Sequence, residues 1–158
     1  MGAWGIGVLS NDRALDHMKY FSNADNESLK GMLLLAYHSE YEEIKVLAVS
    51  ITDAIMNGID KEITIGNSDY AEWFDSLQDR FKAEVETGDL DCLKNEARNT
   101  AWIIINHPTI AWFNIEDTRN YRTMLTKLHD RLDTSDTQWE KIKENSVSNS
   151  VIDIAERN

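Results

Sequence analysis

Apolar residues recur every three to four positions over most of this chain, which is the spacing of one buried face of an α-helix. Only one proline and seven glycines interrupt its 158 residues, so long helical windows remain. We predict an all-α fold of about six helices. Their approximate limits are residues 12–23, 26–38, 39–57, 69–87, 89–106 and 117–132.

Residue types at the ends of these segments support the limits. Asn11 and Asp12 precede the first apolar stripe, and both residue types cap helix N-termini well. Ser39 and Glu42 have the spacing of a capping box, which predicts reciprocal hydrogen bonds at the start of the third helix. Gly58 follows that helix and is a typical stop residue.

The pattern also predicts the domain organisation. The chain has the length of one domain, and it turns polar after residue 132. We therefore predict one helical domain over residues 1–132 and a polar, partly ordered C-terminal extension over residues 133–158. Any strand is expected to be a short piece near residues 4–9 or 62–66; we favour a loop over residues 59–68.

The first nine residues combine three glycines with apolar side chains. The segment GIGVLS superficially resembles a dinucleotide-binding fingerprint, but there is no room for a strand before it and the position of the third glycine holds Ser10. We predict no cofactor. The glycines are instead expected to let the chain fold back tightly, so that Trp4 and its apolar neighbours fill a hydrophobic groove.

The same opening residues carry a family resemblance. MGAWG followed by Asn-Asp, and then by alanine and an acidic residue, resembles the start of a bacterial family known as domain of unknown function 4259. The resemblance implies a helical, cytosolic bacterial domain and implies no activity. Its structural signature in this chain is Gly2, Trp4, Gly5, Asn11 and Asp12.

Charge narrows the choice of partner. The chain has 16 basic and 28 acidic residues, a net charge of −12, so nucleic acids and anionic membranes would be repelled. A basic protein is the natural complement, although acidity can also serve solubility alone. The single cysteine, Cys92, and the lack of a signal-peptide pattern favour the cytoplasm, and the longest apolar runs are too short to span a bilayer.

The most informative charges form an acidic stripe on the fourth predicted helix, opposite its aromatic face. Like charges at this spacing repel one another and cost the helix some stability. Such a surface can attract and hold a basic partner, and the alternative is a merely solvated helix face on which Asp69 is the N-cap. We predict that the stripe binds a basic protein, with an immunity protein that neutralises a cationic toxin such as a nuclease as the leading hypothesis. The predicted partner-binding residues are Asp69, Glu72, Asp75, Asp79 and Glu86.

Catalytic signals are weak. None of the four histidines pairs with Glu, Cys or another His at a metal-binding spacing, and His129 and Asp130 are expected to point in different directions on their helix. We predict no metal and no catalytic residue. Two alternatives stay open: a small hydrolase or metal-dependent enzyme whose Asp and His residues meet only in the fold, and a phage or mobile-element inhibitor that mimics nucleic acid.

Overall fold

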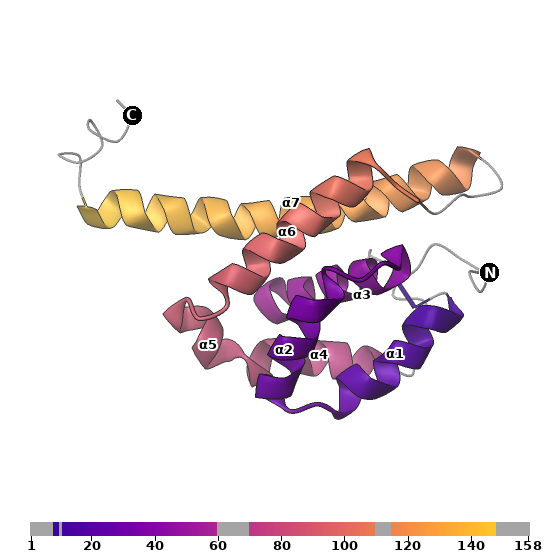
Figure 1. The fold of residues 1–158 in the computed structure, drawn as a ribbon. Helices are drawn as coiled ribbons and strands as arrows, with labels where there is room; N and C mark the ends of the chain where they lie inside the picture. The colour runs from indigo at the N-terminus through magenta and orange to yellow at the C-terminus, as the bar shows by residue number, and fades with distance from the viewer. Residues whose placement is uncertain (1–7, 10, 60–69, 110–114, 148–158) are drawn as a thin grey trace.

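The computed structural model describes residues 8–9, 11–59, 70–109 and 115–147, with side chains as far as Asp133. These residues form seven helices and no strand, which confirms the all-α prediction (Figure 1). Within them, no helix combines the length and the apolar character that crossing a membrane requires. The helices are α1 (Asp12–Asn23), α2 (Asn26–Ala36), α3 (Glu42–Asn57), α4 (Ala71–Arg80), α5 (Lys82–Thr87), α6 (Asp91–Asn106) and α7 (Ile115–Val147).

The helix α3 forms the centre of the fold. It contacts each of the other six helices, and 12 of its 16 residues are buried. Such a helix is apolar almost all round, as expected of an element with neighbours on every side. In Figure 1, α7 and α6 lie above α3, while α1, α2 and α4 lie below it. The upper and lower helices are therefore held together through α3.

Two helix limits differ from the sequence pattern. The predicted helix 69–87 is divided into α4 and α5 at Phe81. The backbone of Phe81 forms the turn between the two helices, and its side chain is fully buried in the core. The last helix continues to Val147, beyond residue 132, so the predicted boundary between domain and extension falls inside α7. The possible strands at 4–7 and 62–66 lie outside the described residues, and residues 8–9 form a turn.

The first helix begins as the sequence predicts. The side chain of Asn11 accepts a hydrogen bond of 2.7 Å from the amide of Ala14, and Asp12 is the exposed first residue of α1. Val8 and Leu9, just before this cap, are buried in the core. The remaining signature residues, Gly2, Trp4 and Gly5, lie outside the described residues.

The predicted capping box is wrong. Tyr41 is the N-cap residue of α3 and makes no side-chain capping bond. The carboxylate of Glu42 instead accepts hydrogen bonds from the hydroxyl of Tyr121 on α7 and from the amide and hydroxyl of Thr109, at 2.7 and 2.9 Å. Because α3 is central, its first residue is buried, and three donors from Thr109 and Tyr121 compensate for the buried charge.

Candidate functional site

The acidic surface predicted from the sequence lies on α4 and α5. Glu72, Asp75 and Asp79 of α4 and Glu86 of α5 are all exposed, and none forms a hydrogen bond or ion pair with another described residue. Asp69 lies outside the described residues. We call these four side chains the α4–α5 acidic surface. They present carboxylates whose hydrogen-bonding capacity is left to solvent or to a partner.

The opposite face of α4 explains why these carboxylates point outward. Phe74 and Leu77 are buried, and the half-buried Trp73 packs against Phe74 with ring centroids 5.3 Å apart and ring planes at 87°. These apolar side chains belong to the common core, and α4 packs on α3. Burial of one helix face fixes the rotation of α4, so the alternate positions face solvent.

A groove runs beside the acidic surface. It has a volume of about 370 Å³ and lies among α3, α4 and α5. Ile55, Met56 and Val85 form the apolar part of its lining. Asp79 and Glu86 of the acidic surface also line it. Its remaining lining residues are Gln78 and Lys82. The helical periodicity carries no signal for this groove, because its apolar residues come from different helices.

The nearest arginine does not neutralise the acidic surface. The guanidinium of Arg80 donates to the side-chain oxygen of Asn26, at 2.7 Å from Nη2 and 3.0 Å from Nε, and also to the carbonyl of Ala24. It thereby ties α4 to the start of α2. Lys82 is the nearby cation that stays exposed.

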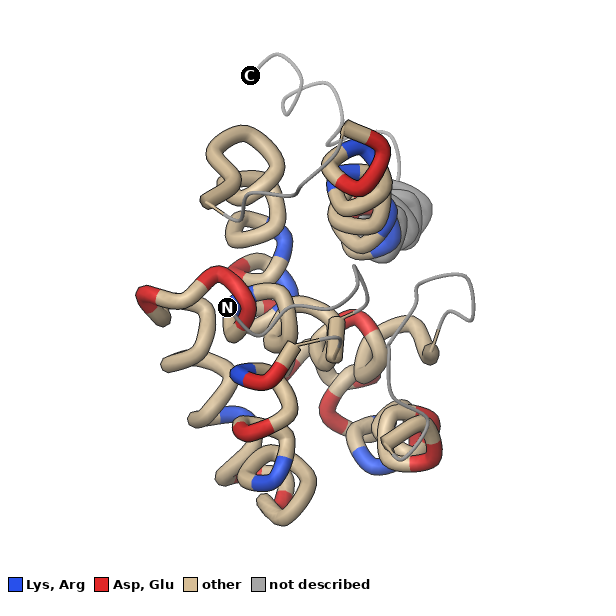
Figure 2. Tube along the Cα trace, turned by 90° about the vertical axis from the view of Figure 1, so that its right-hand side faces the viewer, with Lys and Arg blue, Asp and Glu red and all other residues tan. Residues whose placement is uncertain are grey.

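Lysine and arginine positions recur along α7, the helix seen end-on at the upper right of Figure 2, where blue segments occur beside red ones. They line a second groove, of about 510 Å³, which the sequence reading missed. A signal was present, because Arg119 and Arg122 are three residues apart and Lys127 and Arg131 four, so the members of each pair are neighbours on the helix surface. We call this feature the α7 basic groove. Its described lining residues are Arg119, Arg122, Thr123, Thr126, Lys127, Asp130 and Arg131.

Arg131 has a structural role within this groove. Its Nε lies 3.0 Å from both carboxylate oxygens of Asp53, and its Nη2 donates to the carbonyl of Gly58 at 2.6 Å. The side chain of Asp53 is only 4% exposed. The side-chain amide of Asn57 donates to the same carboxylate at 3.0 Å. This network fastens α7 to the C-terminal end of α3.

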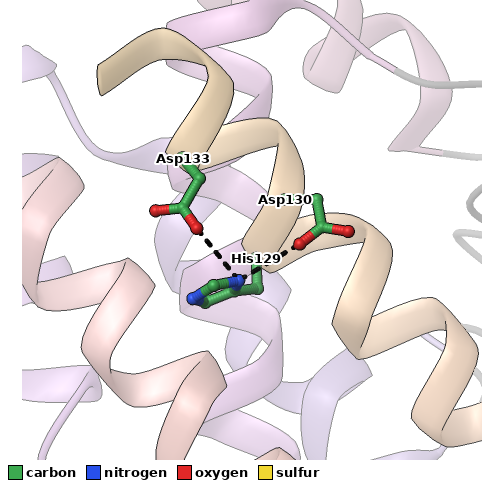
Figure 3. A group of neighbouring side chains, drawn as sticks. All are labelled: His129, Asp130 and Asp133. Carbon is green, nitrogen blue, oxygen red and sulfur yellow. Dashed lines mark hydrogen bonds and ion pairs between the residues drawn. The ribbon is translucent and has the colours of Figure 1, made fainter. Parts of the chain in front are cut away.

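Three titratable side chains meet on α7 at the edge of the basic groove, which Asp130 also lines (Figure 3). Nδ1 of His129 lies 3.3 Å from Oδ1 of Asp130 and 3.5 Å from Oδ2 of Asp133. The expectation that His129 and Asp130 point in different directions is therefore wrong, because their side chains approach each other to 3.3 Å. The sequence signal for this contact is the spacing of four residues between His129 and Asp133, which places the two side chains on the same face of a helix.

This cluster places three ligand or hydrogen-bonding atoms within 4.8 Å of one another. Both carboxylates approach Nδ1 of His129, which donates to them in one tautomer and can act as a ligand atom in the other. Arg98 of α6 lies 3.5 Å from Oδ1 of Asp133 and compensates for its charge. The ring of Trp102 packs beside His129, with centroids 5.6 Å apart. The group joins α6 to α7.

A pocket in which histidine and carboxylate groups converge would favour the enzyme hypothesis over the binding-protein hypothesis. Neither the groove beside the acidic surface nor the α7 basic groove has a histidine among its described lining residues. Comparisons of the chain with protein-family models, with curated proteins and with solved structures found no match. The functional argument therefore depends on the geometry of the molecule itself.

Proposed function

We propose that this chain binds a basic protein through the α4–α5 acidic surface, as a bacterial immunity protein that neutralises a cationic toxin such as a nuclease. The observation that carries the proposal is the combination of four exposed carboxylates, unpaired among the described residues, with an adjoining groove that has an apolar lining. Protein interfaces commonly have this composition, with an apolar centre surrounded by polar and charged groups.

Energetics favour a partner over a purely solvated helix face. Glu72, Asp75 and Asp79 are neighbours at spacings of three and four residues, where like charges destabilise a helix by roughly 0.2–0.5 kcal/mol per pair. Lysines and arginines of a partner would remove this repulsion on binding. They would also be attracted over a distance, which raises association rates at low salt.

The groove beside the acidic surface adds apolar contact area, which the exposed carboxylates do not provide. Exposed ion pairs contribute only about 0.2–1 kcal/mol each, so four carboxylates do not by themselves hold a partner tightly. An apolar or arginine side chain inserted between Met56 and Val85 would be buried at the centre of the contact, where most binding energy resides. The carboxylates of Asp79 and Glu86 are then placed to bind a cationic end of that side chain.

A nuclease is a suitable target because its surface is built to accept phosphates, and carboxylates compete for the same cationic groups. Mimicry of nucleic acid by a mobile-element inhibitor would use the same surface against another DNA-binding protein. The two versions differ in what is inhibited, whereas the hydrolase alternative requires a reaction of the chain itself.

The test is a capture experiment with a charge-reversal variant. Glu72→Lys/Asp75→Lys/Asp79→Lys changes the net charge from −12 to −6. The control Asp12→Lys/Asp16→Lys/Glu40→Lys makes the same change at exposed positions outside the acidic surface. Purified wild-type protein and both variants are immobilised, exposed to an extract of the source bacterium at low and high salt, and the bound proteins are identified by mass spectrometry.

We expect a basic protein that the wild type and the control retain at low salt, that high salt weakens, and that the α4 variant does not retain. Addition of the wild-type protein should then inhibit the activity of that partner, such as DNA or RNA cleavage. Equal capture by the wild type and the α4 variant would contradict the proposal.

A further inference from the structure

The α7 basic groove is unexpected in a chain with a net charge of −12. Four of the chain's 16 lysines and arginines line it, all from one helix. It lies beside the C-terminal end of α3, to which Arg131 is bonded, whereas the acidic surface is on α4, below α3 in Figure 1. The two charged features are carried by different helices, and both adjoin the C-terminal end of α3, where Ile55 and Met56 line the groove beside the acidic surface.

Two of the cations have nothing to bind within the described chain. Arg119 and Arg122 are exposed, one helical turn apart, and neither side chain forms a hydrogen bond or ion pair with a described residue. Their guanidinium groups repel each other at this spacing, which makes the arrangement unfavourable without a ligand. Arginine presents paired N–H donors that match the oxygen atoms of a phosphate group.

The other groups around them select for an anion. The hydroxyls of Thr123 and Thr126 already donate to the carbonyls of Arg119 and Arg122, at 2.9 and 2.8 Å, so their protons are not offered to a ligand. The donors that face the groove are therefore cationic. Asp130, the carboxylate at the groove, is paired with His129.

The dimensions indicate a ligand larger than a single phosphate. Eight residues separate Arg119 from Lys127, which corresponds to about 12 Å along the helix. The groove, of about 510 Å³, is wide and open to solvent, so it leaves room for several linked groups. No aromatic side chain occurs among the described lining residues, so recognition would depend on charge concentrated in one compact group. Linked phosphates supply such a group.

We propose that the α7 basic groove binds a polyphosphate group, either as an inorganic polyphosphate or as the phosphate chain of a nucleotide, through the guanidinium groups of Arg119 and Arg122. The net negative charge of the protein does not prevent this, because repulsion from distant carboxylates is screened over roughly 8 Å at physiological salt. Contacts within the groove are much shorter than that distance.

The test uses ¹⁵N NMR spectra, in which the side-chain Nε–H signals report on the arginines of the wild type and the backbone amide signals of α7 report on binding in every variant. Tripolyphosphate is titrated into the wild-type protein, into Arg119→Ala/Arg122→Ala and into the control Lys19→Ala/Lys82→Ala. Both variants carry a net charge of −14, two units below the −12 of the wild type, and all four replaced residues are exposed. Alanine maintains helices well, so α7 is expected to persist, which circular dichroism checks.

We expect saturable shifts of the Arg119 and Arg122 signals, an affinity at least about tenfold weaker in the double arginine variant, and an affinity within about twofold of the wild type in the control. A parallel titration with ATP distinguishes the sources: equal affinity indicates recognition of phosphates alone, and tighter binding indicates that the nucleoside also contributes. Both results support a polyphosphate site.

Absence of saturable shifts, or equal weakening in the two variants, would overturn the proposal. A second copy of the chain is the competing occupant, because its α4–α5 acidic surface complements the groove. Sedimentation velocity detects this case. If the arginine variant loses a self-associated species but binds tripolyphosphate as the wild type does, the groove is a protein contact and the polyphosphate proposal fails.

Discussion

Replacement of Arg131 by methionine should destabilise the fold far more than an ordinary surface substitution. The side chain of Arg131 is 25% exposed, whereas that of Asp53 is 4% exposed. Arg131→Met therefore removes the cation that faces a buried carboxylate, and it also removes the donor to the carbonyl of Gly58. Loss of one partner of a buried ion pair typically costs about 3–5 kcal/mol.

The partner substitution should cost less. Asp53→Asn removes the negative charge but keeps an oxygen that can accept from Arg131, whose guanidinium reaches solvent and two backbone carbonyls. We expect a loss of about 1–3 kcal/mol, the usual cost of an impaired buried hydrogen bond. The double variant Asp53→Asn/Arg131→Met contains neither charge, so its loss should be smaller than the sum of the two single losses.

Urea unfolding of the wild type and the three variants, followed by circular dichroism, completes a double-mutant cycle. The expected coupling between Asp53 and Arg131 is about 1–3 kcal/mol. The reasoning would be refuted if Arg131→Met lowered the unfolding free energy by less than about 1 kcal/mol, or if the two single effects were additive within about 0.5 kcal/mol.

The remaining predictions concern two buried tyrosines and two glycines, one at the end of α3 and one in α2. Burial raises the pKa of Tyr37, and burial together with the negative charge of Glu42 raises the pKa of Tyr121, both from the ordinary value of 10.0. Their protonated forms are favoured in the folded state, so stability is complete below pH 10 and should fall above it by about 1.4 kcal/mol per pH unit per tyrosine. Urea unfolding between about pH 9 and pH 11 measures this decline, and Tyr121→Phe should reduce its slope; a flat profile would contradict the assignment. Gly58 has φ 81° and ψ 166°, a conformation that only glycine adopts readily, so Gly58→Ala should cost about 1–3 kcal/mol. Gly31→Ala, at an exposed helical position with open space around it, should instead stabilise by about 0.5–1 kcal/mol, and thermal unfolding of both variants would show whether the signs differ as expected.

The sequence predicted the helices well because each buries one face, and such a face produces a periodic pattern that can be read locally. The Asn11 cap was predictable for the same reason, since its bond reaches only three residues along the chain. The break between α4 and α5 was not predictable. Phe81 fits the helical stripe of apolar residues. Only the packing of the folded protein makes it a turn residue with a buried side chain.

Contacts between distant residues explain the remaining differences. Glu42 has the correct local spacing for a capping box, but Tyr121 and Thr109, which bind it instead, lie 79 and 67 residues away. The pairing of Asp53 with Arg131 spans 78 residues and was equally invisible. The exposure of the α4 carboxylates followed from helical periodicity, and the cations of the α7 basic groove were visible in the sequence as residues of one helix. The groove beside the acidic surface combines residues of three helices, which the local pattern does not encode.

The measurement that tests the central claim most directly is the association rate of the basic partner with the wild type, the α4 triple variant and the matched control, recorded by surface plasmon resonance over a range of salt concentrations. The account predicts rapid, salt-sensitive association for the wild type and the control, and little or no association for Glu72→Lys/Asp75→Lys/Asp79→Lys. Association of the α4 variant at the wild-type rate, with the same salt dependence, would show that the α4–α5 acidic surface is not the binding site.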